Sequence, residues 1–518
     1  MSSFDLSRRS LLGGSAAIGA TLAFAGLAEA QNASGTMTVG VPATLTTLDP
    51  ANANDTLSQS VARLLLEGLL GFDKDMKVIP LLAESYEASE DAKEFTFHLR
   101  KGIKFQDGTP FDASAVKVNF ERVADPSNHL KRQSLLATLD HVEVVDPYTA
   151  KCVLRQPFGA FIPTIAHPAL QLLSPAALKK YGAQIGRNPV GTGPFRFVRW
   201  SPDTLEVAAH PNYWQKGLPH MKSVTVRSNP EDGPRIAMLQ AGEAQFIYPV
   251  PAPMVKLVQN SPKLALVDDP SIIVNYVAMN VTKKPYSDLR VRQALNHAID
   301  KQAFIKIVFN GYAKPLLSAQ PPKVTFYAEQ PAYDYDPKKA RALLAAAGYK
   351  DGFETTIWAS TQTQSIQAMQ FIQQQFAAVG IKVNVVPLES GVLDSRIWSV
   401  QKAEDSKLEL YYGGWSSSTG DADWALRPLF WSKGGPPTLY NVGYYSNPDV
   451  DRDLEGALQT ADPAKRGTLY ADAQKRIVAD AAWVFLVVQD VLAGRDKRLA
   501  DAWRLPDGGL LVDAARMT

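Results

Sequence analysis

The chain has 518 residues, with 54 lysines and arginines against 52 aspartates and glutamates, so its formal net charge is only +2. Apolar residues make up 46% of the sequence and charged residues 20%, a balance that excludes an intrinsically disordered chain. The near-neutral charge gives no electrostatic basis for binding nucleic acid or an anionic membrane surface. Cys152 is the only cysteine, which excludes an intramolecular disulfide and a cysteine-based zinc site. This length predicts roughly two to four domains.

The first thirty residues have the pattern of a secretory signal peptide. Arg8 and Arg9 precede an uncharged, mildly hydrophobic stretch, which ends in the small-residue cleavage pattern Ala-Glu-Ala at residues 28–30. Paired arginines are typical of twin-arginine signals, so we expect residues 1–30 to direct export to the periplasm and then to be removed. An uncleaved anchor helix is the alternative. After cleavage, no other segment is predicted to span a membrane.

Short β-strands are predicted in the first half of the chain. Apolar and polar residues alternate over residues 95–99, and residues 142–144 and 152–154 flank a turn that contains Asp-Pro. Similar segments continue to about residue 210. We therefore expect an α+β first half with a β-rich insertion at about residues 85–210.

Amphipathic helices alternate with strands in the second half. The apolar residues within 291–299 recur with the spacing of one helix face. Asp336, Asn447 and Asp462 each stand directly before a proline, which is typical of a helix start. This alternation predicts an α/β domain over about residues 275–488.

The sequence contains no motif for covalent or metal chemistry. No two of the seven histidines are three or four residues apart, and the HExxH, GxSxG and P-loop patterns are missing. Asp449, Asp451 and Asp453 resemble the start of a calcium-binding loop, but Leu454 stands where that loop needs glycine. Acidic residues in the first turn of a helix explain this pattern better. We predict no metal site and no cofactor.

Residues 398–445 contain ten aromatic residues in 48 positions, which makes this segment the best candidate for ligand binding. Within it, a loop rich in glycine, hydroxyl and carboxylate groups over residues 413–424 follows an apolar strand at 408–412. Loops at strand ends of α/β sheets commonly bind ligands, and aromatic walls suit a small amphipathic ligand. The carboxylate of Asp421 or Asp423 is suited to a ligand ammonium group. The alternative is that the aromatic residues form core and the aspartates cap turns.

Four segments of the chain resemble the bacterial extracellular solute-binding proteins of the dipeptide, oligopeptide and nickel class. They are residues 94–111 (EFTFHLRKGIKFQDGTPF), 188–195 (NPVGTGPF), 288–296 (DLRVRQALN) and 335–341 (YDPKKAR). The resemblance therefore extends over nearly the whole mature chain. It implies an α/β, two-lobed periplasmic binding protein of the cluster C type, with a β-rich subdomain inserted in the first lobe.

The resemblance also implies how the chain is divided and what it does. Lobe I would comprise residues 31–274, lobe II residues 275–488, and residues 489–518 would return to lobe I. Members of this family are binding proteins without enzymatic activity. They capture a ligand between two closing lobes and deliver it to a membrane permease that ATPase subunits drive. A sensory role at a membrane receptor is the alternative.

Within the family, residues 53–59, 414–425 and 436–441 are most similar to members that bind glutathione, although their loop tends to carry glutamate where this chain has Asp421. The resemblance thus implies that the ligand is glutathione or a short peptide. Another peptide, an opine or a nickel complex are alternatives, as is, in another class of protein, an exported hydrolase.

The predicted ligand contacts come from both lobes. The resemblance implies polar contacts from Asp55 and Thr56 in lobe I, and Arg396 is chosen for a ligand carboxylate because it precedes Trp398 closely in sequence. The full predicted set is Asp55, Thr56, Arg396, Trp398, Trp415, Ser416, Asp421, Asp423, Trp424 and Asn441.

Overall fold

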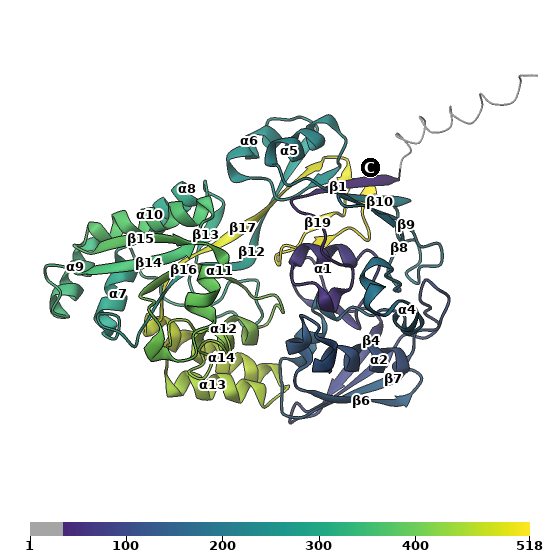
Figure 1. Cartoon of the computed structure of the whole chain (residues 1–518), viewed down its shortest axis with the longest axis horizontal. Helices are drawn as coiled ribbons and strands as arrows, with labels where there is room; N and C mark the ends of the chain where they lie inside the picture. The colour runs from purple at the N-terminus through teal and green to yellow at the C-terminus, as the bar shows by residue number, and fades with distance from the viewer. Residues whose placement is uncertain (1–34) are drawn as a thin grey trace, which may run out of the picture.

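The structure is a computed structural model that describes residues 35–518. The predicted signal peptide, residues 1–30, lies outside the described residues. Among the helices of residues 35–518, none is both long and apolar enough to cross a membrane. The described chain forms two lobes, and Figure 1 shows the long strands β12 (Leu264–Met279) and β17 (Trp483–Asp496) running from one lobe to the other.

One mixed sheet passes through both lobes. Its strand order is β15-β14-β16-β12-β17-β11-β1-β10-β9-β8, and β13 pairs with β17 beside this path. β12 and β17 are antiparallel neighbours at its centre. The remaining strands are β15 (Lys382–Leu388), β14 (Glu354–Ser360), β16 (Leu410–Ser416), β13 (Ala313–Pro315), β11 (Phe246–Ile247), β1 (Thr36–Val41), β10 (Ser223–Ser228), β9 (Thr204–Ala209) and β8 (Phe195–Trp200).

The pairing of β12 with β17 changes register where the sheet passes between the lobes. Pro270 pairs with Asp490, but the next regular pair is Val274 with Val488. On one side of this shift β12 pairs with β16 of lobe II, and on the other side β17 pairs with β11 of lobe I. An irregular pair of strands bends and twists more than a regular one, so this shift marks the hinge between the lobes.

Lobe I contains a second sheet, with the order β4-β5-β7-β6, which is the predicted β-rich subdomain. The predicted hairpin around the Asp-Pro turn is confirmed as β6 and β7. β8 and β9, which the expected insertion included, belong to the large sheet instead. The elements of this region are β2 (Leu70–Phe72), β3 (Val78–Pro80), β4 (Ala83–Ala88), β5 (Glu94–Leu99), β6 (Leu139–Asp146), β7 (Thr149–Leu154), α1 (Thr56–Ala62), α2 (Ala113–Ala124), α3 (Phe161–Ile165) and α4 (Pro175–Tyr181).

The predicted helix starts of the second half are confirmed. Asp336, Asn447 and Asp462 each accept a hydrogen bond from a backbone N–H in the first turn of a helix. The helix predicted over 291–299 ends at His297, because Asp300 caps a new helix. The helices from α5 onward are α5 (Asp232–Ala241), α6 (Val255–Gln259), α7 (Leu289–His297), α8 (Lys301–Val308), α9 (Pro337–Ala346), α10 (Thr363–Ala377), α11 (Ser390–Leu393), α12 (Ala422–Phe430), α13 (Pro448–Leu458) and α14 (Pro463–Ala479).

After β17 the chain returns to lobe I. Small antiparallel pairs form between β18 (Leu499–Ala500) and β21 (Arg516–Met517), and between β19 (Trp503–Arg504) and β20 (Leu510–Leu511). Leu510 and Val512 share a hydrophobic cluster with Val39 of β1, and the Leu510 N–H donates to Ser60 Oγ in α1. Segments from the two ends of the described chain therefore stabilise one core.

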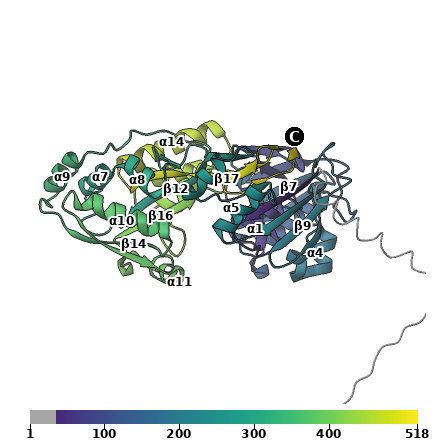
Figure 2. The same cartoon turned by 90° about the horizontal axis from the view of Figure 1, so that it is seen from above.

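The lobes also contact each other away from the hinge. The Gly159 N–H in lobe I donates to the Leu458 carbonyl at the end of α13 over 2.8 Å. The Lys323 Nζ of lobe II lies 3.8 Å from the Asp75 carboxylate of lobe I. Figure 2 shows the two lobes as separate masses on either side of β12 and β17. These polar contacts therefore help to hold the lobes together in the described arrangement.

Candidate ligand-binding site

Strand β16 positions the aromatic-rich segment. It pairs with β12 and β14 in lobe II, and its pairing with β12 extends as far as Ser416. The predicted strand at 408–412 therefore begins two residues later and continues through Gly413 to Ser416, which the sequence had predicted as loop. Hydrogen bonds to the long neighbour β12 keep this glycine-containing stretch extended. Trp415 and Ser416 thus lie on the rigid sheet, and both are half-buried.

The turn between β16 and α12 reaches the other lobe. Gly420 has a φ of 66°, in the left-handed region that glycine adopts without strain, and its carbonyl accepts the Thr325 N–H at 2.9 Å. A Cβ atom at Gly420 would lie 3.2 Å from the Met76 carbonyl oxygen in lobe I. This turn, residues 417–421, is therefore located where the lobes meet.

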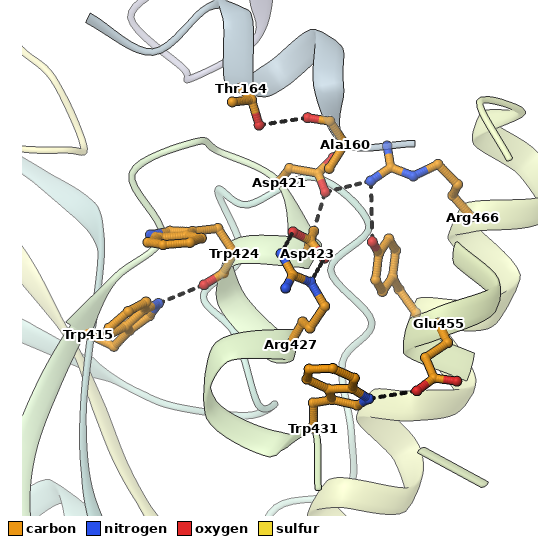
Figure 3. A network of polar contacts seen from close by, with 11 residues as sticks. Ala160, Thr164, Trp415, Asp421, Asp423, Trp424, Arg427, Trp431, Glu455 and Arg466 are labelled. Carbon is orange, nitrogen blue, oxygen red and sulfur yellow. Dashed lines mark hydrogen bonds and ion pairs between the residues drawn. The ribbon is translucent and has the colours of Figure 1, made fainter. Parts of the chain in front are cut away.

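Asp421 is the N-cap of α12 and is 2% exposed. Its Oδ1 accepts the Asp423 N–H at 2.9 Å and the Arg466 Nη2–H at 2.7 Å, as Figure 3 shows. Burial raises the pKa of Asp421, and the positive charge of Arg466 opposes this shift. In this arrangement the carboxylate is already neutralised by a guanidinium from α14.

Asp423 is also buried and also paired inside lobe II. Its two carboxylate oxygens accept hydrogen bonds from Nε and Nη2 of Arg427, one helical turn later, at 2.7 and 2.8 Å. Figure 3 shows both carboxylates with their guanidinium partners. A ligand ammonium at either aspartate would therefore share the carboxylate with an arginine, and these two contacts stay predictions.

Aromatic side chains from three segments of lobe II form one cluster. The centre of the Trp415 ring lies 4.9 Å from the centre of the Tyr440 ring and 5.6 Å from that of Trp424. The ring centres of Trp398 and Tyr440 are 5.6 Å apart. The Trp415 indole N–H donates to the Trp424 carbonyl at 2.8 Å, which fixes the orientation of its ring. Trp398, Trp415 and Trp424 are half-buried, while Tyr440 is 39% exposed. The structure thus brings three predicted residues together in an accessible aromatic surface.

Two other predicted residues of lobe II have different surroundings. Asn441 is buried, and its side chain bonds the backbone of Trp431 and Tyr445 through both of its polar atoms. It therefore holds the turn that carries Tyr440. Arg396 is exposed, with its guanidinium carbon 5.6 Å from the centre of the Trp358 ring.

The predicted residues of lobe I stand at the start of α1. Asp55 caps this helix by accepting the Ser58 N–H at 2.6 Å, and it also accepts the Thr46 hydroxyl at 2.7 Å. The Asp55 side chain is partly exposed, and Thr56 is exposed. Both residues can therefore be reached from outside lobe I.

The sequence matches a family model over residues 77–436, described as "Bacterial extracellular solute-binding proteins, family 5 Middle". The chain belongs to this family. It is 46% identical over 482 residues to the glutathione-binding protein GsiB of Pectobacterium atrosepticum, with 93% of this chain and 94% of the relative covered. It is 47% identical over 479 residues to GsiB of Salmonella paratyphi A, with 92% of this chain and 93% of that relative covered.

Solved structures of two-lobed binding proteins resemble this family 5 protein along nearly its whole length. HbpA2 from Haemophilus parasuis has a TM-score of 0.85 at 27% identity. The comparison covers 93% of this chain and 100% of HbpA2. DppA from Helicobacter pylori, solved in complex with the peptide STSA, has a TM-score of 0.76 at 25% identity, with 95% and 99% covered. The α/β, two-lobed fold that the resemblance implied is thus confirmed.

The structure of this family 5 protein also indicates one residue that the sequence did not. Arg132 lies in lobe I, where its guanidinium donates from Nε to the Ala53 carbonyl and from Nη2 to the Asn54 carbonyl, each at 3.2 Å. It is therefore held directly beside Asp55. No motif surrounds Arg132, and it lies 79 and 78 residues from Ala53 and Asn54 in sequence. Only the folded structure could identify it.

Proposed function

We propose that this chain is the periplasmic substrate-binding subunit of an ABC importer and that it captures glutathione or a short peptide between its two lobes. The captured ligand would stabilise the closed arrangement and be delivered to a membrane permease with its ATPase subunits. The aromatic cluster carries this proposal, because its Trp415 and Trp424 flank the turn that reaches the other lobe, in a chain 46% identical to a glutathione-binding protein. Aromatic burial would supply affinity, and polar groups of both lobes would orient the ligand.

The proposal is of a binding protein, not an enzyme. Thermal unfolding and calorimetric titration of residues 31–518 would test it against glutathione, its oxidised dimer, di- and tripeptides, an opine and nickel chelates. At a ligand concentration a hundredfold above the dissociation constant, we expect about 2.7 kcal/mol of added stability. A flat response to glutathione with a rise for another ligand would replace the ligand and keep the transport role. Turnover of a bound peptide would overturn the binding role in favour of hydrolysis.

An opine is a specific second candidate ligand. AgaA of Agrobacterium tumefaciens R10, solved in complex with agropinic acid, has a TM-score of 0.74 at 28% identity to this chain, with 93% and 99% of the two chains covered. Binding of agropinic acid in place of glutathione in the same titration would favour this candidate.

Export by the twin-arginine route belongs to the same proposal. Replacing Arg8 and Arg9 together by lysine keeps the positive charge and removes the paired arginines that define this signal. We expect the variant to remain in the cytoplasm at full length, whereas the unchanged chain is recovered from the periplasm without residues 1–30. Equal processing of both proteins would point to a general secretory signal instead.

A further inference from the structure

Arg132 of lobe I is a cation that forms no ion pair within residues 35–518, and it lies beside the start of α1. Two of its three guanidinium nitrogens bond backbone carbonyls, and its Nη1 makes no hydrogen bond within residues 35–518. The side chain is half-buried, so its charge is partly removed from water. A desolvated guanidinium gains much from an anion placed at its free donor, because charge-assisted hydrogen bonds are about twice as strong as neutral ones.

The groups around Arg132 define what such an anion would meet. Burial lowers the pKa of Arg132, and the Tyr440 hydroxyl and the Asp55 carboxylate raise it, so both groups lie near the guanidinium. The buried His167 is also close, and burial together with Arg132 lowers its pKa to about 3. His167 is therefore neutral at physiological pH. Asp55 is the charged side chain that acts on the pKa of Arg132 within residues 35–518.

Tyr440 connects this lobe I arginine with the aromatic cluster of lobe II. Its ring packs against Trp415 and Trp398, and its side chain is accessible. The Tyr440 hydroxyl of lobe II and the Arg132 Nη1 of lobe I are both hydrogen-bond donors, and Tyr440 is near enough to act on the pKa of Arg132. A carboxylate bound by both donors would favour the arrangement in which the lobes are together.

We infer that Arg132 and Asp55 bind a free α-amino-acid group of the ligand, with its carboxylate on Arg132 and Tyr440 and its ammonium on Asp55. This inference rests on the proposed function and specifies its substrate class. The γ-glutamyl residue of glutathione carries an ammonium and a carboxylate on the same carbon atom. In an α-linked peptide the carboxyl on the carbon atom that carries the ammonium group is consumed in the peptide bond, so the ammonium and a carboxylate are never on the same carbon atom. The site therefore selects γ-glutamyl peptides.

Calorimetric titration of residues 31–518 with glutathione and with its α-linked isomer, α-Glu-Cys-Gly, tests the inference. We expect the unchanged protein to prefer glutathione at least tenfold. Arg132→Gln should weaken glutathione binding about 10- to 100-fold and reduce the preference between the isomers. Arg199→Gln is the matched control, because it removes an exposed guanidinium of the same lobe, on the outer strand β8, and should change neither value.

A second variant separates recognition from a supporting role of Arg132 in lobe I. Asp55→Asn keeps an oxygen that can cap α1 but removes the negative charge, so the fold should persist while the preference for glutathione falls. If either variant bound both isomers more weakly but kept the same preference for glutathione, the inference would be overturned. A general loss of structure weakens binding of both isomers equally, whereas loss of a recognition contact changes the preference. Equal binding of both isomers by the unchanged protein would also overturn it. Binding of neither would instead refute the proposed function.

Discussion

Arg466 of α14 and Asp421 at the start of α12 form a buried ion pair. The Arg466 Nη2 and Asp421 Oδ1 are 2.7 Å apart, and the two side chains are 6% and 3% exposed. The same guanidinium lies 5.0 Å from the centre of the Phe326 ring. One aspartate thus caps a helix and neutralises a buried cation, so the turn that it ends is held against α14.

Removing one partner of this pair should destabilise the protein strongly. We expect Arg466→Met to lower the free energy of unfolding by about 3 to 5 kcal/mol, because Asp421 would remain as an unpaired buried charge. The double variant Arg466→Met/Asp421→Asn should recover part of this loss. Urea unfolding of residues 31–518 measures both. Arg452→Met breaks an exposed pair with Asp449 and should cost less than about 1 kcal/mol. Equal losses in the buried and exposed variants would contradict this account.

Local signals in the sequence predicted much of the fold. An Asp or Asn before proline sets a helix start through a hydrogen bond to the next turn, so Asp336, Asn447 and Asp462 could be recognised without the fold. The long strands β12 and β17 were harder to predict in extent. Their length depends on pairing with each other, which no local pattern records.

The candidate site was predictable only in part, for the same reason. Its aromatic residues lie within one segment, so their composition could indicate the cluster. The ionic partner of Asp421 is Arg466, which lies 45 positions later in the sequence. The neighbour of Asp55 is Arg132, which is also distant in the sequence. A carboxylate in a glycine-rich loop gives the same sequence signal whether it binds a ligand ammonium or an internal guanidinium. Only the three-dimensional arrangement can distinguish these two cases.

The aromatic cluster should account for much of the ligand affinity. We expect Trp415→Ala to weaken glutathione binding about 10- to 100-fold, because it removes the ring that contacts both Tyr440 and Trp424. Calorimetric titration of the folded variant provides the measurement. Tyr86→Ala removes an exposed aromatic ring from β4 in lobe I and should leave the affinity unchanged. Unchanged binding by the Trp415 variant would show that the ligand contacts another surface.

The contact at Gly159 should control how closely the lobes approach. A Cβ atom there would lie 2.2 Å from the Thr460 carbonyl oxygen and 2.7 Å from that of Ala457, so Gly159→Ala must displace backbone of lobe II. Such overpacking costs about 1 to 3 kcal/mol, and only when the lobes are together. We therefore expect the variant to bind the ligand about tenfold more weakly than the unchanged protein, or more weakly still. X-ray scattering should also give a larger radius of gyration.

Gly233→Ala is the matched control for this substitution. Gly233 lies in helix α5 of lobe I, and an added methyl group there would have no heavy atom within 4 Å. Its ligand affinity and radius of gyration should equal those of the unchanged protein. If Gly159→Ala also left both values unchanged, the contact between Gly159 and α13 would have no part in closure.

The hinge contains a carboxyl group whose ionisation should make stability depend on pH. Asp490 lies in β17 beside the register shift, and its side chain is 1% exposed. Burial and, next in size, the nearby Asp268 carboxylate raise its pKa to about 6. The nearest cation is Lys314, with 3.9 Å between its Nζ and Asp490 Oδ2. Asp490 is therefore protonated more readily in the folded protein than in the unfolded chain.

This difference fixes the sign of the pH effect. An unfolded aspartate has a pKa of about 3.9, so between about pH 4 and pH 6 the folded state holds a proton that the unfolded chain has released. The contribution of Asp490 to stability is therefore greatest at low pH and is lost as the pH rises through about 6.

Asn at this position is neutral at every pH. Asp490→Asn should thus be more stable than the unchanged protein by about 1 kcal/mol at pH 7.5 and by clearly less at pH 4.5. Urea unfolding at the two pH values measures the difference, and Asp472→Asn, at an exposed position of α14, should show no such change. A stability gain of the Asp490 variant that is the same at both pH values would mean that its charge is not responsible.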